Sequence, residues 1–285
     1  MITSTFNTWD KGIFSVINRP GGPTTKDVSE PKYFYRRDNL ETNYPRKFQE
    51  YGPEDIIYKF NQYGFRSDEF VDDGRDSIMS VGDSFTMCLG VPDDHSWPYI
   101  LSKKFTDCKN YNLGLAASSS DYVVRAVSKT IDILKPKAVF VFWPGLSSRE
   151  IPMRKNYLPF KTTSVMGEEN SVDPIFQNIV KLVQDNTYII YQYRKNVELL
   201  RAICQSRNIP CQELEVCTYS KDIETVNIAN EESQYDFNKL DNAQHPPGHE
   251  LGFQRTTRDE VHLSYEWNKH ITELFYAQYL KNTNT

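Results

Sequence analysis

A serine follows a short apolar run near the start of the most regularly patterned part of the chain. The run from Ser77 to Val81 ends at Gly82, and the sequence continues with Asp83 and Ser84. We expect Ser84 to project from the turn after a buried strand, at the sheet edge where open α/β folds place their ligands. A serine hydroxyl there is a candidate nucleophile, although an ordinary turn would use Ser84 or Asp83 only to cap the next helix.

A candidate base lies far downstream of this serine. Asp259 precedes His262 by three residues, just before an apolar-periodic segment that predicts a helix. Within one loop, the Asp carboxylate can turn back to the imidazole Nδ1 and leave Nε2 free to face a serine. The same spacing is also compatible with a capping Asp and a surface histidine. With Ser84, these residues form a candidate Ser-His-Asp triad.

The two segments together resemble the motifs of the SGNH (GDSL-type) hydrolases, which combine G-D-S near the start of the α/β region with D-x-x-H before its final helix. The flanking sequence is also similar to that family. It includes an N-x-x-G-F-R lead-in at 61–66, the segment GDSFTMCLGVPDDHSWPYIL at 82–101, and a second block N-x-G at 112–114. The resemblance covers about residues 61–280 and leaves the N-terminal segment outside.

The resemblance implies a role for each member of the triad. Ser84 would be the nucleophile, His262 the general base and acid, and Asp259 the residue that orients His262. The reaction would be ester hydrolysis through an acyl-enzyme, with no cofactor and no metal ion.

The resemblance also implies the donors of an oxyanion hole. The backbone N–H groups of Ser84 and of Ala117, which aligns with a family glycine, would supply two of them. The family's third donor is an Asn side chain after the third strand, and this chain has no Asn there. Ser147, Ser148 or Arg149 would have to replace it, and losing one such donor costs about 10²–10³ in rate.

Two functions from different classes fit this pattern. The first is a serine esterase or acylhydrolase, including a carbohydrate O-deacetylase, acting on a small-molecule or glycan ester. The second is a weakly active or inactive module of the same fold that binds glycans or builds a larger assembly, such as a phage virion. Metal binding by His245 and His249 is disfavoured, because the intervening Pro-Pro-Gly forbids the helix that this spacing needs.

Composition narrows the class of protein. The 285 residues carry 33 Lys and Arg against 38 Asp and Glu, so a net charge of −5 argues against a nucleic-acid partner. No apolar run is long enough to span a membrane, and no Sec-type signal starts the chain. We therefore expect a cytoplasmic location, while a phage particle or a non-standard export route would leave the same pattern. The five cysteines lack C-x-x-C spacing and are expected to be reduced thiols.

Strand-like and helix-like segments alternate from residue 77 onward, which predicts an α/β fold. The expected strands are 77–81, 111–115, 138–143 and 209–216, and the expected helices are 97–105, 121–134, 175–207 and 264–280. Residues 144–174 and 219–258 show no periodicity. We predict a flavodoxin-like three-layer α/β/α sandwich with a parallel sheet over residues 56–285. An irregular N-terminal arm, 1–55, would wrap over it, dock onto a protein partner or mediate self-association.

Overall fold

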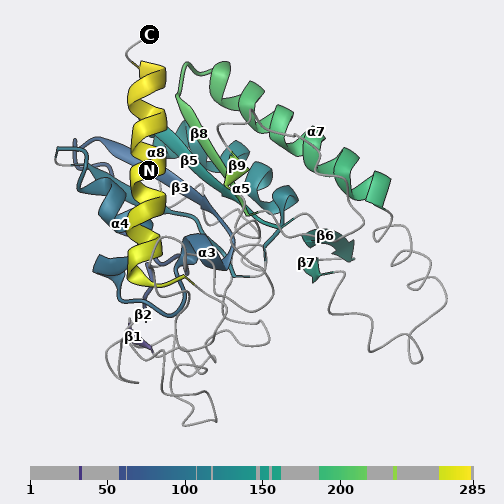
Figure 1. Cartoon of the computed structure of the whole chain (residues 1–285), viewed down its shortest axis with the longest axis horizontal. Coiled ribbons are helices and arrows are strands. Elements are labelled where there is room, and N and C mark those ends of the chain that lie inside the picture. Colours follow the sequence, from purple (N-terminus) through teal and green to yellow (C-terminus); the bar gives the residue numbers. More distant parts are fainter. Residues whose placement is uncertain are drawn as a thin grey trace.

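A parallel sheet lies at the centre of the chain in the computed structural model (Figure 1). The structure describes residues 32–33, 58–61, 63–106, 108–116, 118–145, 148–153, 156–161, 186–216, 234–235 and 263–283. The expected N-terminal arm lies outside the described residues except for strand β1 (Lys32–Tyr33). This strand pairs antiparallel with β2 (Tyr58–Lys59). Among the described residues, no helix is both long and apolar enough to cross a membrane.

The sheet has the strand order of the flavodoxin-like folds. Strand β3 (Ser77–Gly82) pairs with both β4 and β5, and β8 joins the sheet beyond β5. The full order is β4-β3-β5-β8-β9, with every pair parallel. Numbered along the chain, this is the order 2-1-3-4-5. The predicted fold is confirmed, with a short fifth strand added. The remaining bounds are β4 (Lys109–Asn112), β5 (Ala138–Trp143), β8 (Cys211–Val216) and β9 (Gln234–Tyr235).

The central strands are buried on both faces, which explains their unbroken apolar sequence. Every residue of β3 and β5 is buried. Alternate side chains of β5 enter two different clusters: Val139, Val141 and Trp143 pack on one face, whereas Phe140 and Phe142 pack on the other. These aromatic residues therefore belong to the core.

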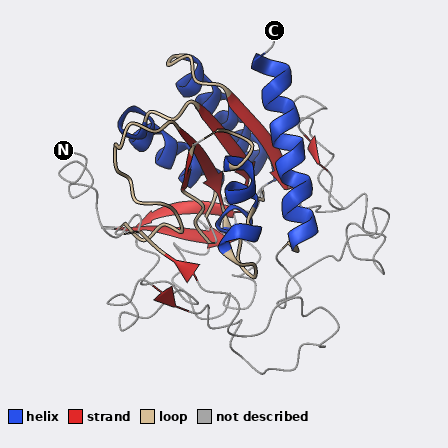
Figure 2. Ribbon diagram, turned by 90° about the vertical axis from the view of Figure 1, so that its left-hand side faces the viewer, coloured by secondary structure: helices blue, strands red, loops and turns tan. Residues whose placement is uncertain are grey.

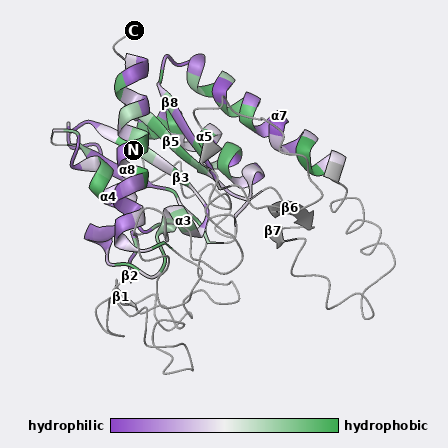
Figure 3. Cartoon of the chain, viewed as in Figure 1, coloured by the Kyte–Doolittle hydropathy of each residue, from purple (hydrophilic) through white to green (hydrophobic). Residues whose placement is uncertain are grey.

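Helices cover both faces of the sheet, and this produces three layers (Figures 1 and 2). Helices α5 (Ser120–Leu134) and α7 (Asn186–Gln205) pack on the first face and against each other. Helices α4 (Trp97–Ser102) and α8 (Tyr265–Thr283) pack on the second face. Figure 3 shows alternating green and purple bands along α7, and Tyr193, Val197 and Leu200 of this helix enter the core.

Strand β4 starts and ends earlier than the sequence pattern predicts. Hydrogen bonds to β3 continue beyond its end, from the N–H groups of Leu113 and Leu115, and the chain there is also held by the side chain of Asn112. Its Oδ1 accepts a hydrogen bond from the Gly114 N–H at 2.8 Å, and its Nδ2 donates to the Thr86 carbonyl at 2.9 Å. The expected strand 111–115 is therefore wrong in its bounds. Helix α4 also stops before residue 105, since the N–H groups of Lys104 and Phe105 donate to carbonyls only three residues earlier.

An antiparallel hairpin interrupts the segment 144–174, which was expected to be irregular. Strand β6 (Ser148–Met153) pairs with β7 (Asn156–Lys161) over six residue pairs. Each strand contains a proline, Pro152 or Pro159, and prolines normally argue against a strand. A two-stranded sheet tolerates them because each strand has a free edge.

Candidate functional site

Ser84 occupies the first position of a short helix at the carboxyl end of β3. Helix α3 (Ser84–Met87) is capped by Asp83, whose Oδ1 accepts a hydrogen bond from the Phe85 N–H at 2.9 Å. The alternative role for Asp83, that of a helix cap, is therefore confirmed. The cap leaves the Ser84 hydroxyl with no structural task at the helix start. The residue is 8% exposed at the edge of the sheet.

Two glycines let the backbone pack closely around this turn. A Cβ at Gly82 would lie 2.4 Å from the Phe142 carbonyl oxygen, and one at Gly114 would lie 2.4 Å from the Met87 nitrogen. Real side chains cannot approach backbone atoms this closely, so both positions require glycine. The N-x-G block at 112–114 thus holds α3 against the sheet, and Asn112 completes the contact through the Thr86 carbonyl.

The segment after this block also binds the turn. The Leu115 N–H and the Ser118 hydroxyl both donate to the carbonyl of Gly82, at 3.0 Å each. Ser119 then caps α5 by accepting a hydrogen bond from the Tyr122 N–H at 3.4 Å. Ala117, the expected second oxyanion donor, lies outside the described residues.

The start of α8 is tied to the segment that follows Ser84. Asn268 accepts a hydrogen bond from the Trp97 N–H at 3.1 Å through Oδ1, and its Nδ2 donates to the carbonyls of Leu263 and Ser264. The Trp97 indole in turn donates to the Phe85 carbonyl at 3.1 Å. The side chain of Asn268 therefore connects the start of α8 to the segment that follows Ser84.

Sequence reasoning missed Asn268. The available signal was a polar residue on the apolar side of a predicted helix, between Trp267 and Ile271, both of which are fully buried. A buried polar side chain must find partners, so its position predicted an internal hydrogen-bonding role.

The other site predictions fall on residues that the structure does not describe. Asp259 and His262 lie in the segment 236–262, and Ser147 lies in the gap 146–147. Leu263, the residue after His262, is described and buried in the same cluster as Cys88 and Trp97. Of the candidate triad, the structure thus locates Ser84 alone.

The lead-in motif at 61–66 has a structural role. Asn61 Oδ1 accepts hydrogen bonds from the N–H groups of Tyr63 and Phe65, and Gly64 adopts a positive φ of 83°. This turn directs Arg66 beneath the loop after α3. There its guanidinium donates to the carbonyls of Met87, Cys88 and Val91 and pairs with Asp93.

A pair of buried carboxyl groups lies on β8 near the same sheet edge. Glu213 accepts hydrogen bonds from the Trp143 indole at 2.9 Å and from Arg201 Nε at 2.7 Å. Glu215, 5% exposed, follows two residues later on the same face of the strand. Burial and the neighbouring Glu213 charge raise the pKa of Glu215 to about 7.

This shift makes the stability of the fold depend on pH. The pKa of Glu215 in the folded state lies above the unfolded value of about 4.3, so the stabilisation is present at acidic pH and is lost as the pH rises through about 7. From pH 5 to pH 8, we expect the free energy of unfolding of the wild type to fall by about 2–3 kcal/mol relative to Glu215→Gln.

Urea unfolding of both proteins at pH 5, 6, 7 and 8 measures this difference. Glu198→Gln, a change at an exposed position of α7, is the matched control and should run parallel to the wild type. If the curves of Glu215→Gln and the wild type also stay parallel, Glu215 does not titrate in this range.

Comparison with known proteins gives structural similarity at low sequence identity. No protein-family model matches the chain, and no curated protein matches it. Among solved structures, it is similar to the psychrotrophic esterase EstA from Pseudoalteromonas sp., at 14% identity and a TM-score of 0.42, over 74% of this chain and 100% of that one. The lipase Lip_vut3 from a goat rumen metagenome matches at 9% identity and a TM-score of 0.41, over 71% and 96% of the two chains.

A third similar structure is AlinE4, described as an SGNH-hydrolase family esterase. It matches at 13% identity and a TM-score of 0.32, over 53% of this chain and 62% of that one. These structural neighbours are thus esterases and a lipase, and they include a member of the SGNH-hydrolase family.

Proposed function

We propose that this chain is a serine esterase in which Ser84 is the nucleophile, His262 the general base and Asp259 the residue that orients it. The observation that carries the proposal is the position of Ser84. It lies at the carboxyl edge of a doubly covered parallel sheet, on a turn whose helix cap is supplied by Asp83. Open α/β sheets bind ligands at this edge.

The start of α8 supports the assignment of the base. Leu263 directly follows His262 in the sequence and packs in the same cluster as Cys88, four residues after Ser84. Asn268 fixes that end of α8 to the backbone of Trp97.

The proposed reaction has two halves. The Ser84 Oγ attacks the ester carbonyl carbon while His262 Nε2 takes the hydroxyl proton, and a tetrahedral intermediate forms. His262 then returns the proton to the leaving alcohol as the C–O bond breaks and an acyl-enzyme remains. Water repeats the sequence, releases the acid and restores Ser84. Asp259 stabilises the imidazolium through Nδ1 in both halves.

Backbone N–H groups are the proposed oxyanion donors. Ser84 is the first residue of α3, so its N–H has no acceptor within the helix. Support for Ala117 comes from its neighbours, since Leu115 and Ser118 both bind the Gly82 carbonyl two residues before Ser84. Ser147, after β5, is the proposed third donor in place of the Asn that this sequence lacks.

Covalent labelling tests the proposal. A fluorophosphonate probe reacts with an activated serine: Oγ bonds to phosphorus and fluoride leaves. We expect one adduct per chain, on the peptide that carries Ser84, together with loss of p-nitrophenyl acetate hydrolysis. The run Ser118–Ser120, at the same sheet edge, is an internal control and should stay unlabelled.

Labelling at another serine, or hydrolysis that survives complete labelling of Ser84, would contradict the proposal. If the protein neither reacts with the probe nor hydrolyses the ester, the alternative gains support. That alternative is a binding or structural module on the same fold.

A further inference from the structure

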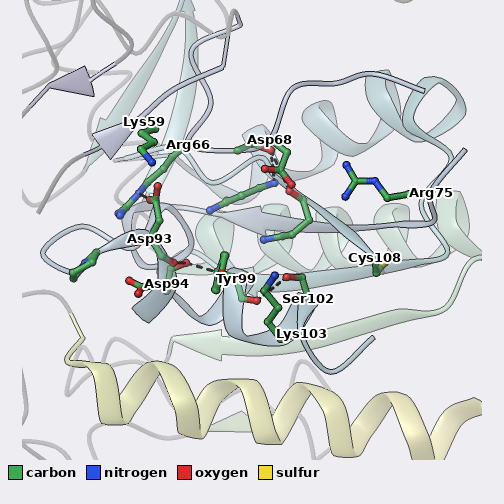
Figure 4. A pocket seen from close by; sticks show the side chains of 15 residues that line it. Lys59, Arg66, Asp68, Arg75, Asp93, Asp94, Tyr99, Ser102, Lys103 and Cys108 are labelled. Atoms are coloured by element: carbon green, nitrogen blue, oxygen red, sulfur yellow. Dashed lines mark hydrogen bonds and ion pairs between the residues drawn. The ribbon is translucent and has the colours of Figure 1, made fainter. Parts of the chain in front are cut away.

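A cavity of about 710 Å³ lies beside the edge strand β4, apart from Ser84 (Figure 4). One wall is formed by β2 and the segment 66–75, and the other by the 3₁₀ turn η4 (Asp93–His95) and helix α4. Its volume falls within the range of about 300–1,000 Å³ that is typical of small-molecule sites. The proposed reaction makes no use of this cavity.

The two arginines that line the cavity already bind groups within the protein. Arg66 binds Asp93 and three backbone carbonyls. Arg75 donates through Nε and Nη2 to Asp73, at 3.1 and 2.9 Å. Neither guanidinium therefore offers a free charge to a phosphate or carboxylate ligand.

The other charged side chains on the cavity lining include both carboxylates and ammonium groups. Asp68 and Asp94 are exposed carboxylates, and Lys59 and Lys103 are exposed ammonium groups, all on the cavity lining. The carboxylates would repel a polyanion, and the lysines would repel a polycation. A neutral ligand rich in hydroxyl groups suits both, because a hydroxyl donates to a carboxylate and accepts from an ammonium group.

Tyr99 adds an aromatic surface to this polar lining. Tyr99 is 40% exposed on α4, and the ammonium of Lys103 lies over one face of its ring, 4.6 Å from the ring centre. The electron-rich face of a tyrosine ring attracts the polarised C–H groups of a flat saturated ring. An apolar platform beside balanced hydroxyl-binding groups matches the two kinds of surface that a sugar presents.

We propose that this cavity is a binding site for a neutral oligosaccharide, with Tyr99 as the stacking platform and Asp94 and Lys103 as hydroxyl partners. The inference goes beyond the proposed esterase function and does not depend on it, because binding requires no reaction at Ser84. In an enzyme that acts on glycan esters, such a site would hold the chain away from the reacting bond.

Calorimetric titration of the Ser84→Ala protein tests the inference without turnover. The probes are neutral hexasaccharides of glucose, xylose, mannose and N-acetylglucosamine, beside charged hexagalacturonate and hexaglucosamine. We expect at least one neutral probe to bind more tightly than both charged ones. Tyr99→Ala, added to this protein, should weaken that binding at least tenfold.

Tyr191→Ala is the matched control, since Tyr191 is a 63% exposed tyrosine on α7, on the other face of the sheet. It should leave the affinity unchanged. Asp94→Ala is a second variant at an exposed position and should also weaken binding, which guards against a folding defect in Tyr99→Ala. The inference is overturned if no neutral probe binds, if a charged probe is preferred, or if neither variant weakens binding.

Discussion

Replacing Ser84 by Ala is expected to lower the turnover of p-nitrophenyl acetate by at least about 10³-fold, because the substitution removes the atom that forms the acyl-enzyme. The oxyanion donors and the binding surface would remain, so a small residual rate should persist. The fold should be unaffected, since Asp83 and not Ser84 caps α3. Thermal unfolding of the variant is thus expected to match the wild type within the effect of an ordinary surface substitution.

Ser77→Ala is a suitable control for this experiment. Ser77 is the first residue of β3, at the end of that strand far from Ser84. It is also buried, and it donates a hydrogen bond to the Leu134 carbonyl at 3.2 Å. Its loss should cost about 1 kcal/mol of stability and leave the rate unchanged. The double variant of Ser84 and His262 should be no slower than Ser84→Ala alone, because the two residues act as a unit. An unchanged rate in Ser84→Ala would refute the proposed mechanism.

Arg66→Met should be the most destabilising change in the lead-in motif, with an expected loss of about 3–5 kcal/mol. The Arg66 side chain is 3% exposed. Its guanidinium donates hydrogen bonds to three carbonyls at the end of α3 and in the loop after it, and it pairs with Asp93. Methionine fills a similar volume but leaves the carbonyls of Met87, Cys88 and Val91 without this donor. Urea unfolding measures the loss.

The control for Arg66 is Arg75→Met, in the same segment. The Arg75 side chain is 46% exposed, and its guanidinium pairs with Asp73, which is also partly exposed. Exposed pairs contribute about 0–1 kcal/mol, so this variant should remain close to the wild type. Equal losses in the two variants would show that burial of Arg66 carries no special stabilisation.

Much of the fold could be predicted because its central strands and helices have recognisable patterns of apolar residues in the sequence. The continuous apolar runs of β3 and β5 and the helical spacing of α5 each specify an element without knowledge of its neighbours. The hairpin β6–β7 could not be predicted, since Pro152 and Pro159 conceal its pattern. The hydrogen bond from Asn112 to the Thr86 carbonyl could not be predicted either, since it joins residues 26 positions apart.

Of the predicted triad, the described residues locate one member, Ser84. The position of Ser84 follows from the strand that precedes it, whereas the bond between Asn268 and Trp97 joins residues 171 positions apart. Arg66 could be predicted only as the last residue of the lead-in motif. Nothing in the local sequence shows that its partners are carbonyls about 20 residues away. Polar contacts between residues far apart in the sequence therefore could not be predicted from local patterns.

The attachment of α8 to α4 has a consequence for synthesis of the protein on the ribosome. Helix α8 is made after every other described element, yet it covers Phe140 and Trp97 and supplies the Asn268 bonds. Until it emerges, the nascent chain presents one apolar face of its sheet to solvent or to a chaperone. A ribosome that stalls before Tyr265 should thus release an aggregation-prone fragment.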